Sequence, residues 1–171
     1  VINSDAETYQ MCIADIDGKN EQILFTSKAP IMSPDWSPDR KKIAYVSFEN
    51  GLAEIFIQDL KSGDRDSIQA LGMTNSAPVW SPDGKSLALV VSFSGNPDIF
   101  LYSLNNKRLK RLTNHYGIDT EPSWSPDSKK IIFTSDRSGS PQLYEINTKS
   151  KRKKRLTKDG HYNARGRYFP D

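Results

Sequence analysis

The chain has 171 residues, of which 36% are hydrophobic and 26% charged, and its mean hydropathy is −0.65. This length is typical of a single domain. No apolar run approaches the 18 or more residues of a membrane span, and we expect no secretory leader at the start. Ten Gly and ten Pro are spread along the chain, which predicts many short strands joined by turns.

The net charge of +3 conceals an uneven distribution. Residues 1–100 carry 8 Lys and Arg against 14 Asp and Glu, whereas residues 101–171 carry 16 against 7. A basic half is found in proteins that bind nucleic acid or anionic surfaces, and also in proteins without such a partner. The single cysteine, Cys12, excludes an intrachain disulfide.

A hexapeptide repeat organises the chain. The pattern Pro-x-Trp-Ser-Pro-Asp begins at Pro34, Pro78 and Pro122, at intervals of 44 residues. A degenerate fourth copy begins at Gly166, with Tyr168 at the tryptophan position. The same interval links apolar positions elsewhere, so the repeat is a structural unit and not one recurring motif.

Runs of β-branched and aromatic residues, separated by Gly, Asn, Asp and Ser, predict four strands in each unit. In chain order we expect strands at 9–16 and 22–25; a short strand with Trp36, then 42–47, 54–60 and one ending at 68; a short strand with Trp80, then 85–91, 98–104 and one ending at 112; and a short strand with Trp124, then 130–135, 142–147 and one ending at 156. Several runs are apolar on both faces, and such strands need cover on both sides.

Four-stranded sheets that recur every 40–45 residues and cover each other are the blades of a β-propeller. We therefore predict an all-β chain of four-stranded antiparallel blades that forms part of a propeller. Complete blades are expected at 28–71, 72–115 and 116–159, with the end of one blade at 1–27 and the start of another at 160–171. A closed ring of four blades is the alternative.

The Ser-Pro-Asp step predicts the turn between the first and second strands of each blade, because proline presets φ and the Asp side chain accepts hydrogen bonds from nearby amides. We expect Trp36, Trp80 and Trp124 to be buried between blades. The 44-residue interval places Cys12 at the core position of Phe56, which predicts a buried, unreactive thiol.

The repeat resembles that of the TolB-type propeller family. The resemblance is carried by Met-Ser-Pro-Asp-Trp-Ser-Pro-Asp at 32–39, Ile-Ala-Tyr-Val-Ser-Phe-Glu at 43–49, Thr-Glu-Pro-Ser-Trp at 120–124, Phe-Thr-Ser-Asp-Arg-Ser-Gly at 133–139 and Tyr-Asn-Ala-Arg at 162–165. It covers the whole chain. Propellers attached to prolyl-oligopeptidase-like hydrolases share the Trp-Ser-Pro-Asp repeat, so a propeller accessory to such a hydrolase is the alternative.

Members of this family belong to the periplasmic Tol-Pal system of Gram-negative bacteria. The resemblance implies a periplasmic, non-enzymatic propeller that binds a Pal-like peptidoglycan-associated lipoprotein and colicin peptides, and that supports outer-membrane integrity, cell division and protein transport. It also implies that the TolA-binding domain of the family is absent from this chain. We expect no membrane insertion.

In such propellers, the loops from the fourth strand of one blade to the first strand of the next surround the channel on one face. In this chain these loops are 27–33, 71–77, 114–121 and 158–165. Loops on a rigid scaffold suit protein binding. By position, the candidate partner-binding residues are Met32, Ser33, Thr74, Asn75, His115, Asp119, Thr120, Glu121, Tyr162 and Asn163.

TolB-like propellers can hold calcium in the channel, where Asp35, Asp119 and Glu121 offer oxygens. Calcium takes six to eight oxygen ligands, so three scattered carboxylates favour solvated side chains and no cofactor. The two histidines, His115 and His161, lie out of register with the repeat. No nucleophile elbow, phosphate-binding glycine loop or zinc motif accompanies them, so we expect no catalysis.

The basic run 149–155 resembles a nucleic-acid tract but falls between the third and fourth strands of its blade, as 105–111 does in the preceding one. Its residues include no aromatic ring to stack on bases. We expect a solvated, edge-protecting hairpin and no nucleic-acid partner. An anionic partner is the alternative that the charge leaves open.

Overall fold

The computed structural model describes residues 2–5, 8–68, 74–93 and 95–169, and every regular element in these ranges is a strand. A three-stranded sheet has the order β1 (Ile2–Asp5), β2 (Thr8–Ile13), β3 (Gln22–Ser27). Three four-stranded sheets follow: β4 (Ile31–Trp36), β5 (Lys42–Ser47), β6 (Glu54–Asp59), β7 (Arg65–Ile68); β8 (Thr74–Trp80), β9 (Ser86–Phe93), β10 (Asn96–Ser103), β11 (Arg108–Arg111); and β12 (Asp119–Trp124), β13 (Lys130–Ser135), β14 (Gln142–Asn147), β15 (Lys153–Arg155).

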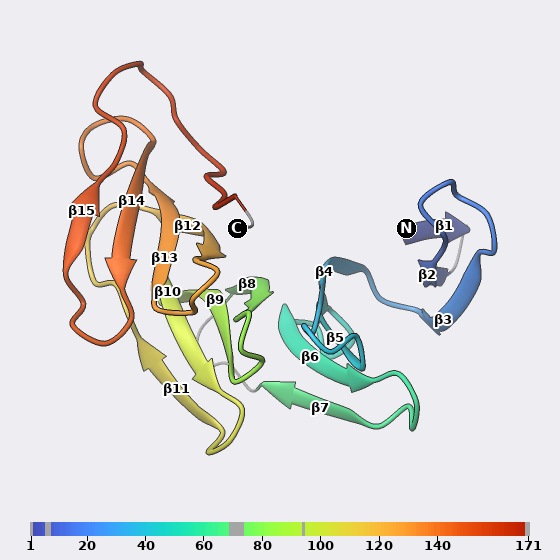
Figure 1. Ribbon diagram of the computed structural model, residues 1–171. Coiled ribbons are helices and arrows are strands. Elements are labelled where there is room, and N and C mark those ends of the chain that lie inside the picture. The colour runs from blue at the N-terminus through green and yellow to red at the C-terminus, as the bar shows by residue number, and fades with distance from the viewer. Residues whose placement is uncertain (1, 6–7, 69–73, 94, 170–171) are drawn as a thin grey trace.

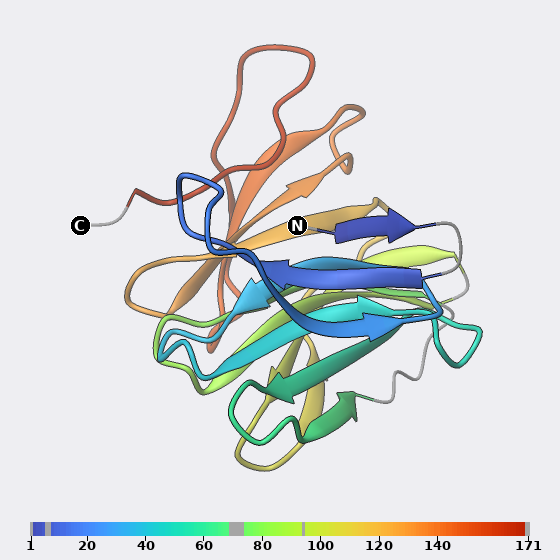
Figure 2. The ribbon, with the colours of Figure 1, turned by 90° about the vertical axis from the view of Figure 1, so that its right-hand side faces the viewer.

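The sheets fan out around a common axis in an open arc, with β4, β8 and β12 innermost and β7, β11 and β15 outermost (Figure 1). Neighbouring strands within each sheet pair antiparallel. Figure 2 views the arc from the side of β1–β3, so that this sheet lies in front of the sheet β4–β7. The strands of the two sheets run in similar directions in this view. The prediction of a partial propeller with four-stranded antiparallel blades is confirmed.

Most strand positions agree with the expectation to within two residues. The largest difference is β2, which ends at Ile13 and not at residue 16, because a turn with Gly18 in the left-handed region (φ 78°) begins there. Cys12 is 5% exposed, which confirms its predicted burial. That burial raises the pKa of the thiol, as expected of an unreactive core cysteine.

The hydrophobic core lies between the sheets. One cluster joins Trp80 and Leu89 to Ala44 and Ile57 of the preceding sheet, and another joins Trp124 to Ala88. Trp80 and Trp124 therefore each cover the blade before their own. The continuous contact between blades explains why their strands are apolar on both faces.

Trp36 does not follow this pattern, and its predicted burial is wrong: 41% of the residue is exposed, against 7% for Trp80 and 8% for Trp124. Trp124 packs on the innermost strand of the preceding sheet, where its Nε1 donates to the Val79 carbonyl at 3.0 Å. Among the described residues, β1–β3 form a sheet of three strands without a counterpart of β8. Trp36 therefore lacks the surface that buries the other two tryptophans.

The Ser-Pro-Asp turns form as predicted. Ser81 Oγ donates to Asp83 Oδ1 at 2.6 Å and accepts from the backbone amide of Ser86 at 3.0 Å, while Asp83 also accepts from the amide of Lys85 at 3.1 Å. The corresponding bonds recur around Ser37 and Ser125. The serine hydroxyl thus links the turn to the start of the second strand in all three blades.

The C-terminal segment 163–169 lies against the last sheet. A Cβ atom added at Gly166 meets Ile132 Cγ2 at 2.7 Å and Leu143 Cδ1 at 3.0 Å, so any larger residue would have to displace these two side chains. Tyr168 Oη donates to Glu145 Oε2 at 2.8 Å and anchors the far end of the segment. These contacts hold the last loop in place over β13 and β14.

Candidate partner-binding site

The candidate loops share one face of the arc because of the strand order. In an antiparallel four-stranded sheet, the turn between the second and third strands lies at the same end as the connection to the next sheet. The loops 27–33, 71–77, 114–121 and 158–165 therefore lie at this end, here called the loop face. Residues 71–73 of the second loop are outside the described residues.

Hydrogen bonds join the second and third loops to neighbouring turns. Asn75 is 2% exposed, and its Nδ2 donates to the Ala53 carbonyl at 2.8 Å. Asn96 Nδ2 donates to the carbonyl of His115 at 2.5 Å, and Asp136 Oδ1 accepts from the amide of Ile118 at 2.7 Å. The third loop and the described end of the second are thus hydrogen-bonded to neighbouring turns, which favours a defined shape of these parts before any partner binds.

The last loop is held in the same way. The Asn163 amide donates to the Pro141 carbonyl at 2.9 Å, and Asn163 Nδ2 donates to Oε1 of the buried Gln142 at 3.1 Å. Thr157 Oγ1 donates to the same oxygen at 2.7 Å. Asn163 therefore positions the loop, and the exposed Tyr162 precedes it in the chain.

Asp119 forms a buried ion pair. Its carboxylate is 0% exposed and accepts from Arg137 Nη2 at 2.7 Å and 2.6 Å. The Arg137 guanidinium also lies over the Tyr144 ring, 4.9 Å from its centroid, and over the Phe133 ring at 5.3 Å. Cation–π contact adds to the ion pair, so Asp119 fixes the start of β12 to the blade.

Glu121 connects β12 to the C-terminal segment. Its Oε2 accepts from Thr134 Oγ1 at 2.8 Å and from the Arg165 amide at 3.1 Å, and its Oε1 accepts from Arg165 Nε at 3.0 Å. Burial disfavours the charged carboxylate, but these hydrogen bonds and the nearby guanidinium outweigh burial and lower its pKa. Glu121 is therefore ionised at neutral pH.

A left-handed bulge recurs at the inner edge of the loop face. Ser33, Ala77, Glu121 and Arg165 lie at 44-residue intervals and have φ values of 53°, 50°, 55° and 56°. The strand register shifts beside the first three of them. Bulges of this kind redirect side chains and are enriched near functional sites.

The exposed candidates lie beyond these anchors. Met32 is 42% and Tyr162 73% exposed, while Ser33 is exposed and Thr120 half-buried. An open pocket with a volume of about 530 Å³ is lined by Leu143 and residues 162–165. His115 is half-buried, and its Nδ1 accepts from the amide of Gly117 at 2.9 Å. Only the backbone of Thr74 belongs to the described structure.

The three carboxylates considered for calcium have separate partners. Asp35 Oδ2 accepts from the backbone amide of Trp80 at 2.7 Å, and burial raises its pKa. Asp119 and Glu121 bind Arg137 and Arg165. Within the described part of the chain, no group of three or more His, Cys, Asp or Glu residues is arranged to hold a metal ion.

Arg137 and Gln142 were missed by the sequence argument, although both organise the face. The 44-residue interval places Glu49 and Phe93 at the position of Arg137, so the repeat offered no signal for it. Gln142 aligns with Glu54 and Asp98. A buried amide at the start of β14 is visible only from its bonds to Thr157 and Asn163.

The model of the TolB beta propeller domain family matches residues 1–171. The chain belongs to this family. The Tol-Pal system protein TolB of Alkalilimnicola ehrlichii is 47% identical over 74 residues, which cover 43% of this chain and 17% of that protein. TolB of Wigglesworthia glossinidia brevipalpis is 51% identical over 69 residues, 40% of this chain and 16% of that protein.

The crystal structure of TolB from Acinetobacter baumannii superposes with a TM-score of 0.86 at 48% identity and covers 93% of this chain. This chain covers 40% of that structure, so it spans less than half the length of the TolB relatives. A prolyl endopeptidase superposes with a TM-score of 0.67 at 17% identity, which shows a shared propeller fold alone. The described residues include no helix long and apolar enough to span a membrane.

Proposed function

We propose that this TolB-family propeller binds the folded domain of a Pal-like peptidoglycan-associated lipoprotein through the loop face. The site acts in the periplasm as part of the Tol-Pal system, without catalysis, and supports outer-membrane integrity and cell division. Colicin peptides that compete for the lipoprotein site are further ligands of the same face.

The observation that carries this proposal is the set of hydrogen bonds that anchor the described loops of the loop face. Buried anchors such as Asn75, Asp119 and Gln142 hold the loops from below, while Met32 and Tyr162 are exposed above them. A preorganised surface loses little entropy on binding, and tyrosine is enriched among residues that dominate interfaces. Of the predicted residues, Met32, Ser33, Thr120 and Tyr162 make the contacts, and Asn75, Asp119, Glu121 and Asn163 position the loops.

An accessory propeller of a hydrolase is the second candidate, and the peptidase resemblance in fold favours it. It predicts hydrolysis only when a catalytic domain is attached. The 48% identity to a solved TolB favours the lipoprotein-binding function over it.

Calorimetric titration with the lipoprotein domain tests the proposal. We expect Tyr162→Ala to weaken binding by about 2 kcal/mol, or more than tenfold, as is usual for a central interface tyrosine. Lys85→Ala is the matched control, because Lys85 is exposed in the turn between β8 and β9 at the opposite end of the blade. Equal affinities of Tyr162→Ala and the wild type would remove Tyr162 from the site, and absence of binding by the wild type would reject the proposed function.

A further inference from the structure

The outer hairpins of the arc differ systematically in charge. Each of these hairpins comprises the turn that leads into the outermost strand and the residues of that strand that follow. In successive sheets the segments are 17–23, 61–67, 105–111 and 149–155, at 44-residue intervals. Counted over these seven-residue segments, the net charge is −1, 0, +4 and +6. The last two segments contain no acidic residue. The basic character of the chain is therefore concentrated on one sector of its outer rim.

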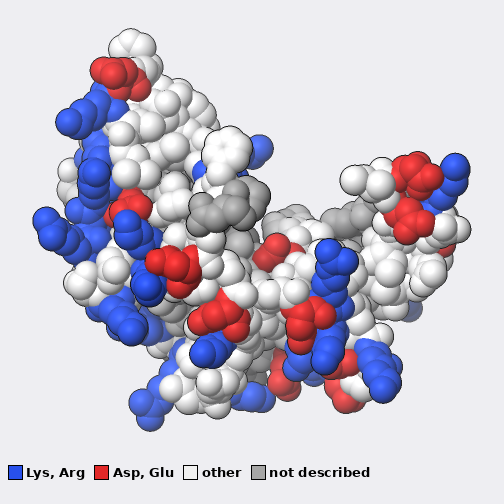
Figure 3. Space-filling view, in the orientation of Figure 1, with Lys and Arg blue, Asp and Glu red and all other residues white. Residues whose placement is uncertain are grey.

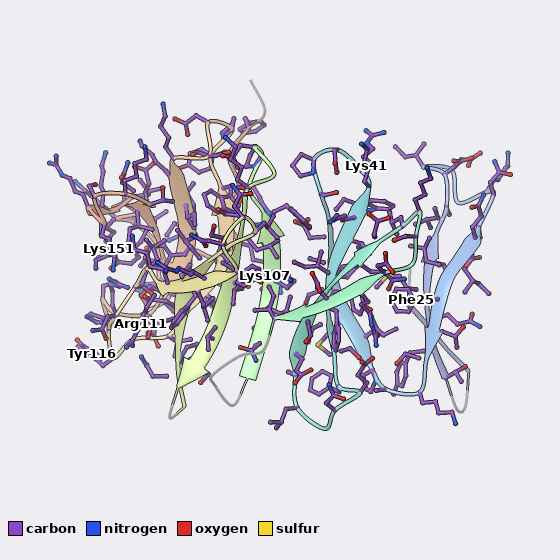
Figure 4. The ribbon with its side chains drawn as sticks, turned by 90° about the horizontal axis from the view of Figure 1, so that it is seen from below. Phe25, Lys41, Lys107, Arg111, Tyr116 and Lys151 are labelled. Carbon is purple, nitrogen blue, oxygen red and sulfur yellow. The ribbon has the colours of Figure 1, made fainter. Side chains whose placement is uncertain are left out.

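The two basic hairpins form one surface. Lys151 Nζ, on the last hairpin, donates to the carbonyl of Arg111 at the end of β11, at a distance of 3.0 Å. Figure 4 shows Lys151 and Arg111 on the same side of the molecule. Lys and Arg line the outer flank over β15, whereas acidic and basic residues mix over β7 (Figure 3). We call the surface formed by 105–111 and 149–155 the basic rim.

Little of this charge is neutralised within the molecule. Asp66 pairs with Lys107 at 3.2 Å, and Asp98 pairs with Arg111. Among the described residues, no carboxylate forms an ion pair with 149–155. Residues 149–154 are all exposed. The charge of this hairpin therefore faces solvent and is available to an external anion.

The shape and the neighbouring side chains identify the kind of anion. The rim lies on the convex outer side of the arc (Figure 1), which suits an extended surface better than a strand held in a groove. A pocket of about 460 Å³ beside β15 is lined by Arg152, Lys153 and Lys154, and by Lys130, which pairs with Glu145 at 3.2 Å. The three cations that have no carboxylate partner among the described residues offer a place for a phosphate group.

Apolar side chains lie next to this charge. Tyr116 is 84% and Ile118 49% exposed in the loop that follows β11, and Tyr116 lies on the same side as Arg111 and Lys151 (Figure 4). Tyrosine favours the interface between lipid and water, and an adjacent exposed isoleucine can enter it. Stacking partners for nucleic-acid bases are absent from both basic segments of the sequence.

We propose that the basic rim binds the surface of an anionic phospholipid membrane, with phosphate groups at 105–111 and 149–155 and Tyr116 at the level of the headgroups. Clusters of four to eight Lys and Arg residues bind anionic lipid surfaces peripherally and without insertion of a helix. The two basic hairpins lie outside the loops of the loop face, and among those loops only 114–121, with Tyr116, is part of the membrane contact. The loops 27–33 and 158–165 therefore remain free for a protein partner.

Co-sedimentation of the chain with lipid vesicles tests this proposal. We expect binding to vesicles of phosphatidylcholine mixed with phosphatidylglycerol, little binding to phosphatidylcholine alone, and release at high salt. The rim variant combines Lys149→Gln, Arg152→Gln, Lys153→Gln and Lys154→Gln. The control variant combines Lys28→Gln, Lys41→Gln, Lys61→Gln and Lys85→Gln, four exposed residues that remove the same charge elsewhere.

The rim variant is expected to bind the anionic vesicles at least tenfold more weakly than the control variant, and Tyr116→Ala several-fold more weakly than the wild type. Both multiple variants should keep the thermal midpoint of the wild type, since the substituted side chains are exposed. An equal loss of binding to anionic vesicles in the rim variant and the control variant would show that only the net charge matters, and it would overturn the proposal. Failure of the wild type to bind anionic vesicles, or tighter salt-dependent binding to duplex DNA than to vesicles, would overturn it as well.

Discussion

Glu121 and Arg165 lie 44 residues apart, at the same position of successive repeats, and bind one another between β12 and the C-terminal segment. Arg165 Nε donates to Glu121 Oε1 at 3.0 Å, and the Arg165 amide donates to Oε2 at 3.1 Å. Both residues have left-handed backbone conformations, with φ of 55° and 56°. The pair therefore fixes the C-terminal segment to the inner edge of the last sheet.

The Glu121 pair predicts a pH dependence of stability. The pKa of Glu121 is lowered in the folded state from its ordinary value of 4.5, so its contribution is present above that value and is lost as pH falls through the folded pKa. Glu121→Gln removes this contribution. We expect the unfolding free energy of the wild type to fall by about 0.5 kcal/mol more than that of the variant when pH is lowered from 6 to about 3. Urea titrations at a series of pH values measure the unfolding free energy of both proteins. The same dependence on pH in the wild type and in Glu121→Gln would contradict this prediction.

Asp119→Ala tests the buried ion pair. The substitution leaves the Arg137 guanidinium, whose side chain is 11% exposed, without its carboxylate. The expected loss of unfolding free energy is about 3–5 kcal/mol. Asp159→Ala, on an exposed loop residue, should change it by less than about 0.5 kcal/mol. In a double-mutant cycle with Arg137→Ala, additive losses would show that the two side chains do not interact as described.

The three tryptophans are expected to respond differently to replacement by phenylalanine. Trp124→Phe removes the indole donor and leaves the Val79 carbonyl without it, at a cost of about 1–3 kcal/mol in addition to lost packing. The Trp80 indole has no hydrogen-bond partner among the described residues, so Trp80→Phe should cost less than Trp124→Phe. Trp36→Phe should change stability by less than about 0.5 kcal/mol. Denaturant unfolding measures all three, and a reversed order would contradict the described packing.

Ser81→Ala tests the turn between β8 and β9. The variant loses the acceptor of the Ser86 amide and the donor to Asp83 in a turn whose serine is 1% exposed. We expect the unfolding free energy to fall by about 1–2 kcal/mol. Ser138→Ala, at an exposed position in a turn at the other end of its blade, is the comparison, with a change below about 0.5 kcal/mol. Hydrogen exchange should speed up at the Ser86 amide, and unchanged exchange there would argue against the bond.

The repeat made most of the fold accessible from the sequence, because one interval of 44 residues aligned the strands, the turns and Cys12 together. The position of a residue in the repeat could not show whether its side chain is buried, because burial depends on the sheet that packs against it. Trp36 occupies the same repeat position as Trp124 but lacks an inner strand to pack on. Asp119 lies in a predicted loop but points to Arg137, a residue with no counterpart in the other repeats.

The most direct measurement of the central claim is the amide hydrogen-exchange footprint of a Pal-like lipoprotein domain on this chain. Binding at the loop face predicts slower exchange in 27–33, 114–121 and 158–165, with no change in the Ser-Pro-Asp turns at 37–42, 81–86 and 125–130. Protection confined to those turns, or to the basic rim, would contradict the assignment of the partner site to the loop face.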